Sequence, residues 1–187
     1  MNENKVINIC GINNRYQIKK LINENKQKKE RVLFKNYIID EDNLTYSNQL
    51  ELLKKIKNYV IDSNDSCNKD YIIKILMREI DKKISSYKQQ DIEKKIHCID
   101  KFITQDNIVN KLVECQMKCY YCNCETYILY KIVRETKQWT VDRIDNNLGH
   151  NIDNYIIACL ECNLKRRRIN CESFLFTKQL NINKIDK

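Results

Sequence analysis

The sequence predicts an α+β fold, in which a mostly helical N-terminal part precedes a small module of short strands. The 187 residues include no proline and only two glycines, so the strongest local helix breakers are nearly missing. Apolar residues recur at helical spacing from about 47 to 117, whereas short extended runs follow from about 127. We therefore expect a helical region over 1–110 and a second unit over 111–187.

Four helices are expected before residue 118. The first begins near Ser47, whose side chain can accept a backbone N–H as an N-cap. The others cover about 69–87, about 91–103 and about 108–117. Polar residues or short loops precede the helices over 69–87 and 91–103. The expected apolar stripes are Leu50, Leu53, Ile56 and Val60; Ile72, Ile73, Leu76, Ile80 and Ile84; and Ile92, Ile96 and Ile99.

The second unit alternates extended runs with turns. Weak alternation over 127–133 predicts one strand, and apolar residues alternating with polar ones over 139–144 predict another. We expect Gly149 to take a positive φ in the following turn. A short strand over 155–157 and a helix from Leu160 complete the unit.

Two Cys-x-x-Cys pairs bracket these strands: Cys119 with Cys122, and Cys159 with Cys162. Each such turn presents two thiolates from one tight loop, so two turns complete the tetrahedral shell that zinc prefers. Four thiolates leave no open coordination position, which predicts a structural Zn²⁺. Cys124 is a spare thiol that would compete less well. A redox Cys-x-x-Cys is the weaker alternative, since no βαβ pattern accompanies it.

The charge and composition indicate an intracellular protein that meets polyanions. The formal net charge is +9, which favours nucleic acid as a partner, although a solvated basic surface explains the same number. No apolar run is long enough for a membrane span, and no export signal is recognisable at the N-terminus. The basic residues of 19–35 fit a solvated helix face or a DNA-contacting arm. We interpret His97 as a structural histidine. The cysteines taken as small apolar fillers are Cys10, Cys67, Cys98 and Cys115.

Residues from about 115 to 168 carry the strings KCYYC, WTVDRIDNNLGHNIDN and CLECNLKRRR. This stretch resembles the zinc-stabilised HNH, or ββα-metal, endonucleases, and is similar to uncharacterised HNH proteins of phages and large DNA viruses. The resemblance implies a metal-dependent endonuclease acting on DNA. It also implies that Asp142 and Asn163 hold one catalytic Mg²⁺ (or Mn²⁺), and that Asn154 clamps the loop by hydrogen bonds to the backbone.

One position departs from that family. Arg143 stands where the general-base histidine is expected, and an arginine stays protonated at physiological pH. His150 is the leading substitute, because an ordinary histidine titrates near neutrality. Arg143 would then stabilise charge on the phosphate. Asp145 is a second metal ligand or orients the attacking water; alternatively Asp145 caps the turn and His150 is a plain loop residue.

A basic run closes the unit. Lys165, Arg166, Arg167 and Arg168 are expected on one helix, where they would bind flanking phosphates or partner the helix dipole. We expect residues 174–176 to pack as core. Because the base position has changed, the competing hypothesis is a catalytically inactive zinc-stabilised module that binds DNA or a protein assembly.

Overall fold

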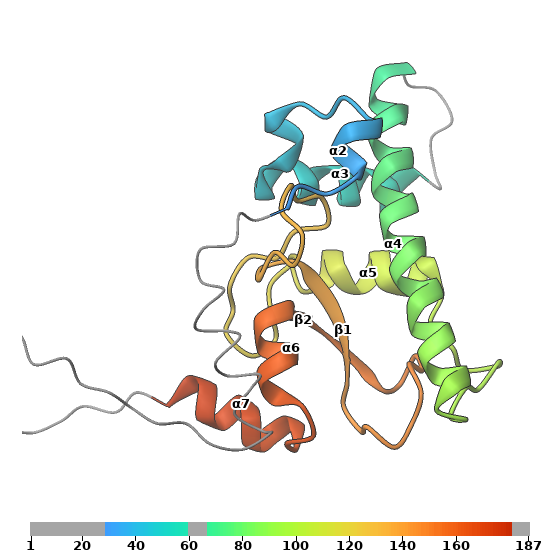
Figure 1. The fold of residues 1–187 in the computed structure, drawn as a ribbon, viewed down its shortest axis with the longest axis vertical. Helices are drawn as coiled ribbons and strands as arrows, with labels where there is room; N and C mark the ends of the chain where they lie inside the picture. Colours follow the sequence, from blue (N-terminus) through green and yellow to red (C-terminus); the bar gives the residue numbers. More distant parts are fainter. Residues whose placement is uncertain (1–28, 60–66, 181–187) are drawn as a thin grey trace, which may run out of the picture.

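The computed structural model describes residues 29–59 and 67–180. Its helical part contains α2 (Leu33–Asn36), the 3-10 helix η1 (Glu41–Leu44), α3 (Tyr46–Tyr59), α4 (Cys67–Glu93) and α5 (Gln105–Glu114). It is followed by β1 (Trp139–Arg143), β2 (Tyr155–Cys159), α6 (Leu160–Arg166) and α7 (Cys171–Gln179), as Figure 1 shows. The predicted α+β class is confirmed.

Some predictions fall outside these ranges. Cys10, Val60 and most of the basic segment over 19–35 lie outside the described residues. The side chain of Cys67 is likewise outside the description.

The prediction of a separate helix over 91–103 is wrong, because α4 continues through the first residues of that range and then stops. Lys95 takes a φ of 58°, and the N–H groups of Lys95 and Ile96 donate to the carbonyls of Ile92 and Asp91. This is a Schellman motif, which ends helices usually at a glycine. Ile92 and Ile99 are consequently exposed instead of buried, and His97 lies in the irregular segment after the helix.

The other helices differ from the prediction at their ends. α3 begins at Tyr46, so Ser47 lies inside its first turn and is not the N-cap. α5 begins earlier than expected, because Thr104 caps it: its hydroxyl accepts from the backbone N–H of Asn107, whose side chain accepts from the Thr104 N–H. This reciprocal capping box satisfies two otherwise free donors.

The sheet has two antiparallel strands, β1 and β2, with Val141 opposite Ile157. The strand predicted over 127–133 does not form; within the described chain that segment makes only isolated bridges, such as Tyr127 with Gln138. The remaining predicted strands and the helix from Leu160 are confirmed.

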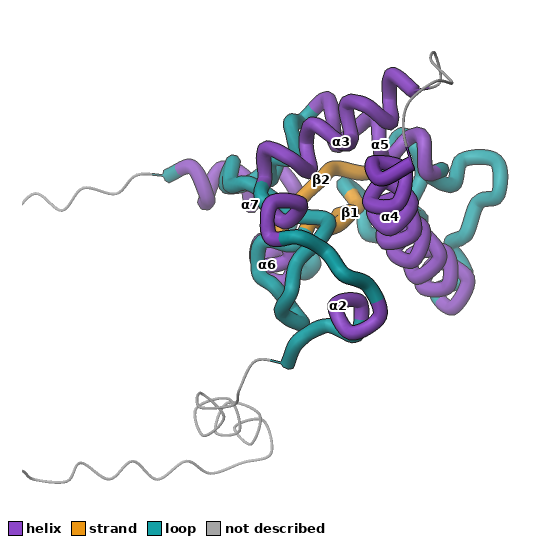
Figure 2. The backbone as a smooth tube through the Cα atoms, turned by 90° about the horizontal axis from the view of Figure 1, so that it is seen from above, coloured by secondary structure: helices purple, strands orange, loops and turns teal. Residues whose placement is uncertain are grey.

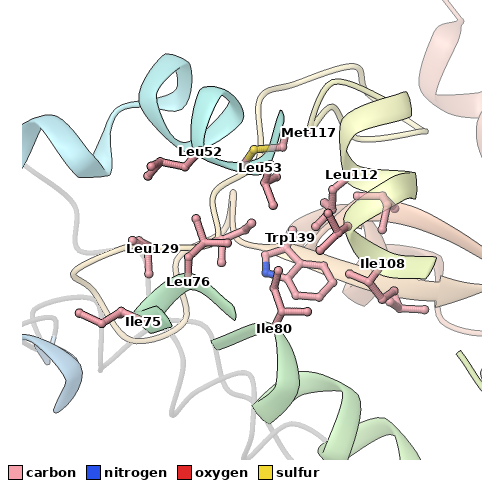
Figure 3. Packing of buried hydrophobic residues seen from close by; sticks show 14 of the residues in the cluster. Leu52, Leu53, Ile75, Leu76, Ile80, Ile108, Leu112, Met117, Leu129 and Trp139 are labelled. Atoms are coloured by element: carbon pink, nitrogen blue, oxygen red, sulfur yellow. The ribbon is translucent and has the colours of Figure 1, made fainter. Parts of the chain in front are cut away.

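Both faces of this small sheet are covered. Viewed from the side and from above, the strands lie between α4 and α6 (Figure 1, Figure 2). One face packs on a core in which Trp139 lies among side chains from α3, α4 and α5 (Figure 3). The other face packs on a second cluster around the cysteines, including Tyr121 and Phe174. Phe176 is 68% exposed, so the expectation that all of 174–176 is core is wrong.

The first core joins residues from both sides of position 110, including Leu53, Ile80, Leu112 and Trp139. Because successive side chains of a strand point to opposite faces, residues 139 and 141 of β1 enter this core while 140 and 142 face the other way. That alternation places Asp142 beside Tyr121 and α6. The division at residue 110 stays a prediction.

Candidate functional site

Four cysteine sulfurs gather where β2 runs into α6. The ligand atoms of Cys119, Cys122, Cys159 and Cys162 all lie within 4.8 Å of one another, and Cys122 Sγ is 3.9 Å from Cys159 Sγ. Zinc–sulfur bonds of about 2.3 Å in a tetrahedron place sulfurs about 3.8 Å apart. The cluster therefore has the donor set and spacing to hold a metal ion such as zinc.

Local backbone structure explains how each pair turns. Asn123 takes a φ of 55° and its N–H donates to the carbonyl of Cys119, which closes the first turn. In the second, the backbone N–H of Cys162 points at the sulfur of Cys159, at 3.4 Å. Burial and neighbouring thiols raise the pKa of Cys162 to about 12, and that of the adjacent Cys124 to about 12. A bound cation would favour the thiolates, because coordination releases their protons.

The carboxylate of Asp142 is buried and already occupied. Oδ2 accepts from the Tyr121 hydroxyl at 2.7 Å, and Oδ1 accepts from Arg166 Nη1 at 2.7 Å. Burial raises the pKa of Asp142, while the hydrogen bond that it accepts from Tyr121 and the charge of Arg166 oppose that rise. Asp142 thus has a strong structural partner of opposite charge.

The prediction for Arg166 is corrected. Its side chain is 1% exposed, and besides Asp142 it donates to the carbonyls of Arg143, Ile144 and Ile169. A guanidinium satisfied in this way holds the end of β1 against α6 and is not available to a phosphate at the surface. The helix also ends at Arg166, since Arg167 takes a φ of 54°, so Lys165 to Arg168 do not share one helix.

Asn163 lies on α6 and faces β1. Its amide nitrogen donates to Thr140 Oγ1 at 3.0 Å and to the Val141 carbonyl at 3.2 Å, which leaves its amide oxygen as an acceptor. That oxygen suits a hard cation. The carboxylate of Asp142 does not suit such a cation, because its oxygens already accept hydrogen bonds from Tyr121 and the cationic Arg166. The predicted Mg²⁺ site at Asp142 and Asn163 therefore does not fit these contacts.

His150 is placed by α4, from outside the segment that resembles a nuclease. Its Nδ1 lies 2.7 Å from Asp91 Oδ1, and its backbone N–H donates to Asp91 Oδ2 at 2.6 Å. The imidazole stacks on the Tyr87 ring, with centroids 4.6 Å apart. Burial lowers the pKa of His150, and Arg143 and Lys94 act in the same direction, whereas Asp91 opposes them. The neutral, proton-accepting form is favoured.

The loop between the strands is held by its own side chains. Asn154 accepts from the Asp145 N–H and donates to the carbonyls of Asp145 and Gly149, which is the clamp expected of it. Asp145 accepts from the Asn147 N–H, so it caps the turn. Arg143 donates to two loop carbonyls, those of residues 146 and 148. Asp145 is exposed and does not line the cleft that contains Asp142.

A cleft of about 380 Å³ opens between α4, β1 and α6 and brings four of the six predicted catalytic residues together. Those lining it include Asp142, Arg143, His150, Asn163 and Arg167, with Lys94. A larger hollow of about 930 Å³ shares Lys94, Arg143 and Arg167 and adds Asp145 and Arg168. Lys165 is exposed and paired with Glu161 at 2.5 Å.

Sequence reasoning missed the contributions of Tyr87, Asp91, Lys94 and Tyr121. One signal was present: Lys83, Tyr87 and Asp91 recur every four residues, so they share one face of α4. The apolar pattern of the sequence instead predicts that Asp91 begins a separate helix.

Comparison of the chain with protein-family models, with curated proteins and with solved structures finds no match. Among the described residues, no helix combines the length and apolar character that crossing a bilayer requires.

Proposed function

We propose that this chain is a nucleic-acid phosphodiesterase of the HNH-like endonuclease kind, with a structural zinc and with His150 as the proton acceptor. The observation that carries the proposal is the cleft in which a neutral histidine and several cations meet. DNA is the first substrate to test, as the resemblance over 115–168 implies.

The chain's own groups supply binding and proton transfer. His150 is buried, and its lowered pKa favours the unprotonated ring, which is the form that can take a proton from an attacking water. Lys94, Arg143 and Arg167 line the same cleft and would attract a phosphate and stabilise the negative charge that develops on it. Asn163 offers an amide oxygen to orient the water or the substrate.

The contacts of Asp142 do not fit a catalytic divalent metal. Because Arg166 already neutralises Asp142, a metal would have to compete with a buried guanidinium for that carboxylate. The zinc cluster has a different role: four thiolates complete its shell, so it would pin the ββα unit.

The same ion pair favours a second candidate. A chain whose Asp142 is held by Arg166, and whose base position carries Arg143, fits a non-catalytic module that binds nucleic acid through its cations. Such a module would still be zinc-stabilised. It has no need of a neutral histidine in the cleft, which is why hydrolysis stands first.

The decisive experiment incubates the purified chain with supercoiled plasmid, single-stranded DNA and RNA, each with Mg²⁺, with Mn²⁺ and without added divalent metal. Wild type should nick or cut at least one substrate, and His150→Gln should lower the rate about 10²- to 10⁴-fold. His97→Gln is the matched control and should cut normally. If wild type leaves every substrate intact across metals and pH but still binds them in a gel-shift assay, the chain is the non-catalytic binding module and not a nuclease.

A further inference from the structure

One face of α4 serves the outer edge of β1. Lys83 donates to the carbonyl of Trp139, and the Tyr87 hydroxyl accepts the N–H of Val141 at 3.0 Å. Asp91, one turn further along, meets His150. Side chains four residues apart lie on the same helix face, so α4 supplies partners to an edge that β2 does not pair.

The contact between Asp91 and His150 is more specific than packing requires. Asp91 is 0% exposed, and both of its carboxylate oxygens are directed at His150. Oδ1 contacts the imidazole ring, and Oδ2 accepts from the backbone N–H. A carboxylate can only accept a hydrogen bond, so this contact favours the tautomer in which Nδ1 of His150 carries the ring proton. Within the described ranges no group hydrogen-bonds to Nε2, which leaves that nitrogen with a free lone pair for the cleft that His150 lines.

Gly149 permits this contact. A Cβ at this position would lie 2.6 Å from the Ile96 carbonyl oxygen and 2.9 Å from Asp91 Oδ2. The φ of Gly149 is outside the positive range, so the prediction of a positive φ is wrong. Glycine is needed here because it leaves room for the neighbouring atoms. The Schellman end of α4 brings the Ile96 carbonyl to this point. The helix terminus and the loop are thus fitted to each other where the histidine sits.

We propose that Asp91 is the positioning residue of His150, holding the imidazole in the Nδ1–H tautomer so that Nε2 accepts the proton of the attacking water. This inference rests on the proposed function and deepens it, because the helical part then completes the reaction site instead of only positioning DNA. A proton of the attacking water moves to Nε2 while the water oxygen bonds to phosphorus. The P–O bond to the leaving group then breaks. The leaving oxygen takes up a proton and the imidazolium releases one.

Several charged or titratable groups surround the imidazole and would shape its pH dependence. They are Asp91 and Tyr87 from α4, Lys94 after that helix, Asp142 and Arg143 from β1, and Arg167 after α6. Asp91 is the one that contacts a ring nitrogen, so its replacement isolates the tautomer.

The test is Asp91→Asn, with Asp81→Asn as the matched control on the exposed side of the same helix. An asparagine is close in shape, but its amide would donate to Nδ1 and move the ring proton to Nε2. The chain has two histidines, so His97→Gln assigns the ¹⁵N resonances of His150 directly. Wild type should show the Nδ1–H tautomer and Asp91→Asn the Nε2–H tautomer. Wild type in the Nε2–H form would overturn the proposal.

Cleavage provides the second readout, on whichever substrate wild type cuts. Asp91→Asn should lower kcat about 10²- to 10⁴-fold with KM little changed, and should alter the pH profile, whereas a merely structural role would not select kcat. An unchanged kcat would refute the positioning role. If wild type cuts nothing, the proposed function fails, and the tautomer measurement still decides whether Asp91 sets the state of His150.

Discussion

Replacing Arg166 with methionine tests whether the Asp142–Arg166 pair is the structural centre of the ββα unit. The two side chains are buried, and their charged atoms are 2.7 Å apart. The guanidinium also satisfies the carbonyls of residues 143, 144 and 169. Methionine keeps much of the volume but removes the charge and all of these donors. The variant therefore leaves a carboxylate buried without its cation.

The cost follows from that burial. Removing one partner of a buried ion pair destabilises a protein by about 3–5 kcal/mol, because the remaining charge is uncompensated. In a chain of this size each kcal/mol shifts Tm by about 2–4 °C, so Arg166→Met should lower Tm by about 6–20 °C. Adding Asp142→Asn should recover part of the loss, since the unpaired charge is then absent. Arg168→Met, at an exposed neighbour, should be nearly neutral.

Denaturant unfolding of the four variants of the Asp142–Arg166 cycle, repeated at several pH values, measures these terms. Burial already raises the pKa of Asp142, and loss of Arg166 should raise it further. A carboxyl whose folded-state pKa is raised stabilises the fold below its unfolded value of about 3.9, and that stability is lost as pH rises through the folded pKa. The deficit of Arg166→Met should therefore shrink as pH falls through that window. A loss below about 1 kcal/mol at neutral pH, with no coupling to Asp142, would refute the structural role of the pair.

Three other predictions follow from the site. Gly149→Ala should disturb the His150 tautomer and lower stability, because its methyl group meets backbone at Ile96; the same NMR and melting measurements report both, and an unaltered tautomer would contradict the fit. Lys94→Gln and Arg167→Gln should each weaken nucleic-acid binding and reduce the slope of log K against log salt by about 1, measured by fluorescence anisotropy; an unchanged slope would exclude a phosphate contact. Fresh protein should contain one zinc per chain by metal analysis, and Cys162→Ser or a strong chelator should remove it and lower Tm; less than one equivalent in unchelated wild type would contradict the four-cysteine site.

The four-cysteine cluster and its surroundings could be predicted because their determinants are local. Each Cys-x-x-Cys turn places its own two sulfurs, and the apolar run before Cys159 predicts β2 leading into α6. The clamp by Asn154 also spans only a few residues. Such contacts depend on short-range geometry that sequence spacing describes directly.

The sequence by itself determined which chemistry could gather in this chain: four thiolates, a histidine, an aspartate with an asparagine, and an excess of cations. Tertiary structure alone decided how these groups are used. Asp91 meets His150 across 59 positions, and Arg166 turns inward to Asp142 across 24. Neither pairing has a spacing signature, because each depends on where α4 ends and on how α6 packs against β1. The pairing of Asp91 with His150 depends on the Schellman turn at Lys95, which forms without glycine. The pairing of Arg166 with Asp142 depends on burial of the second face of the sheet.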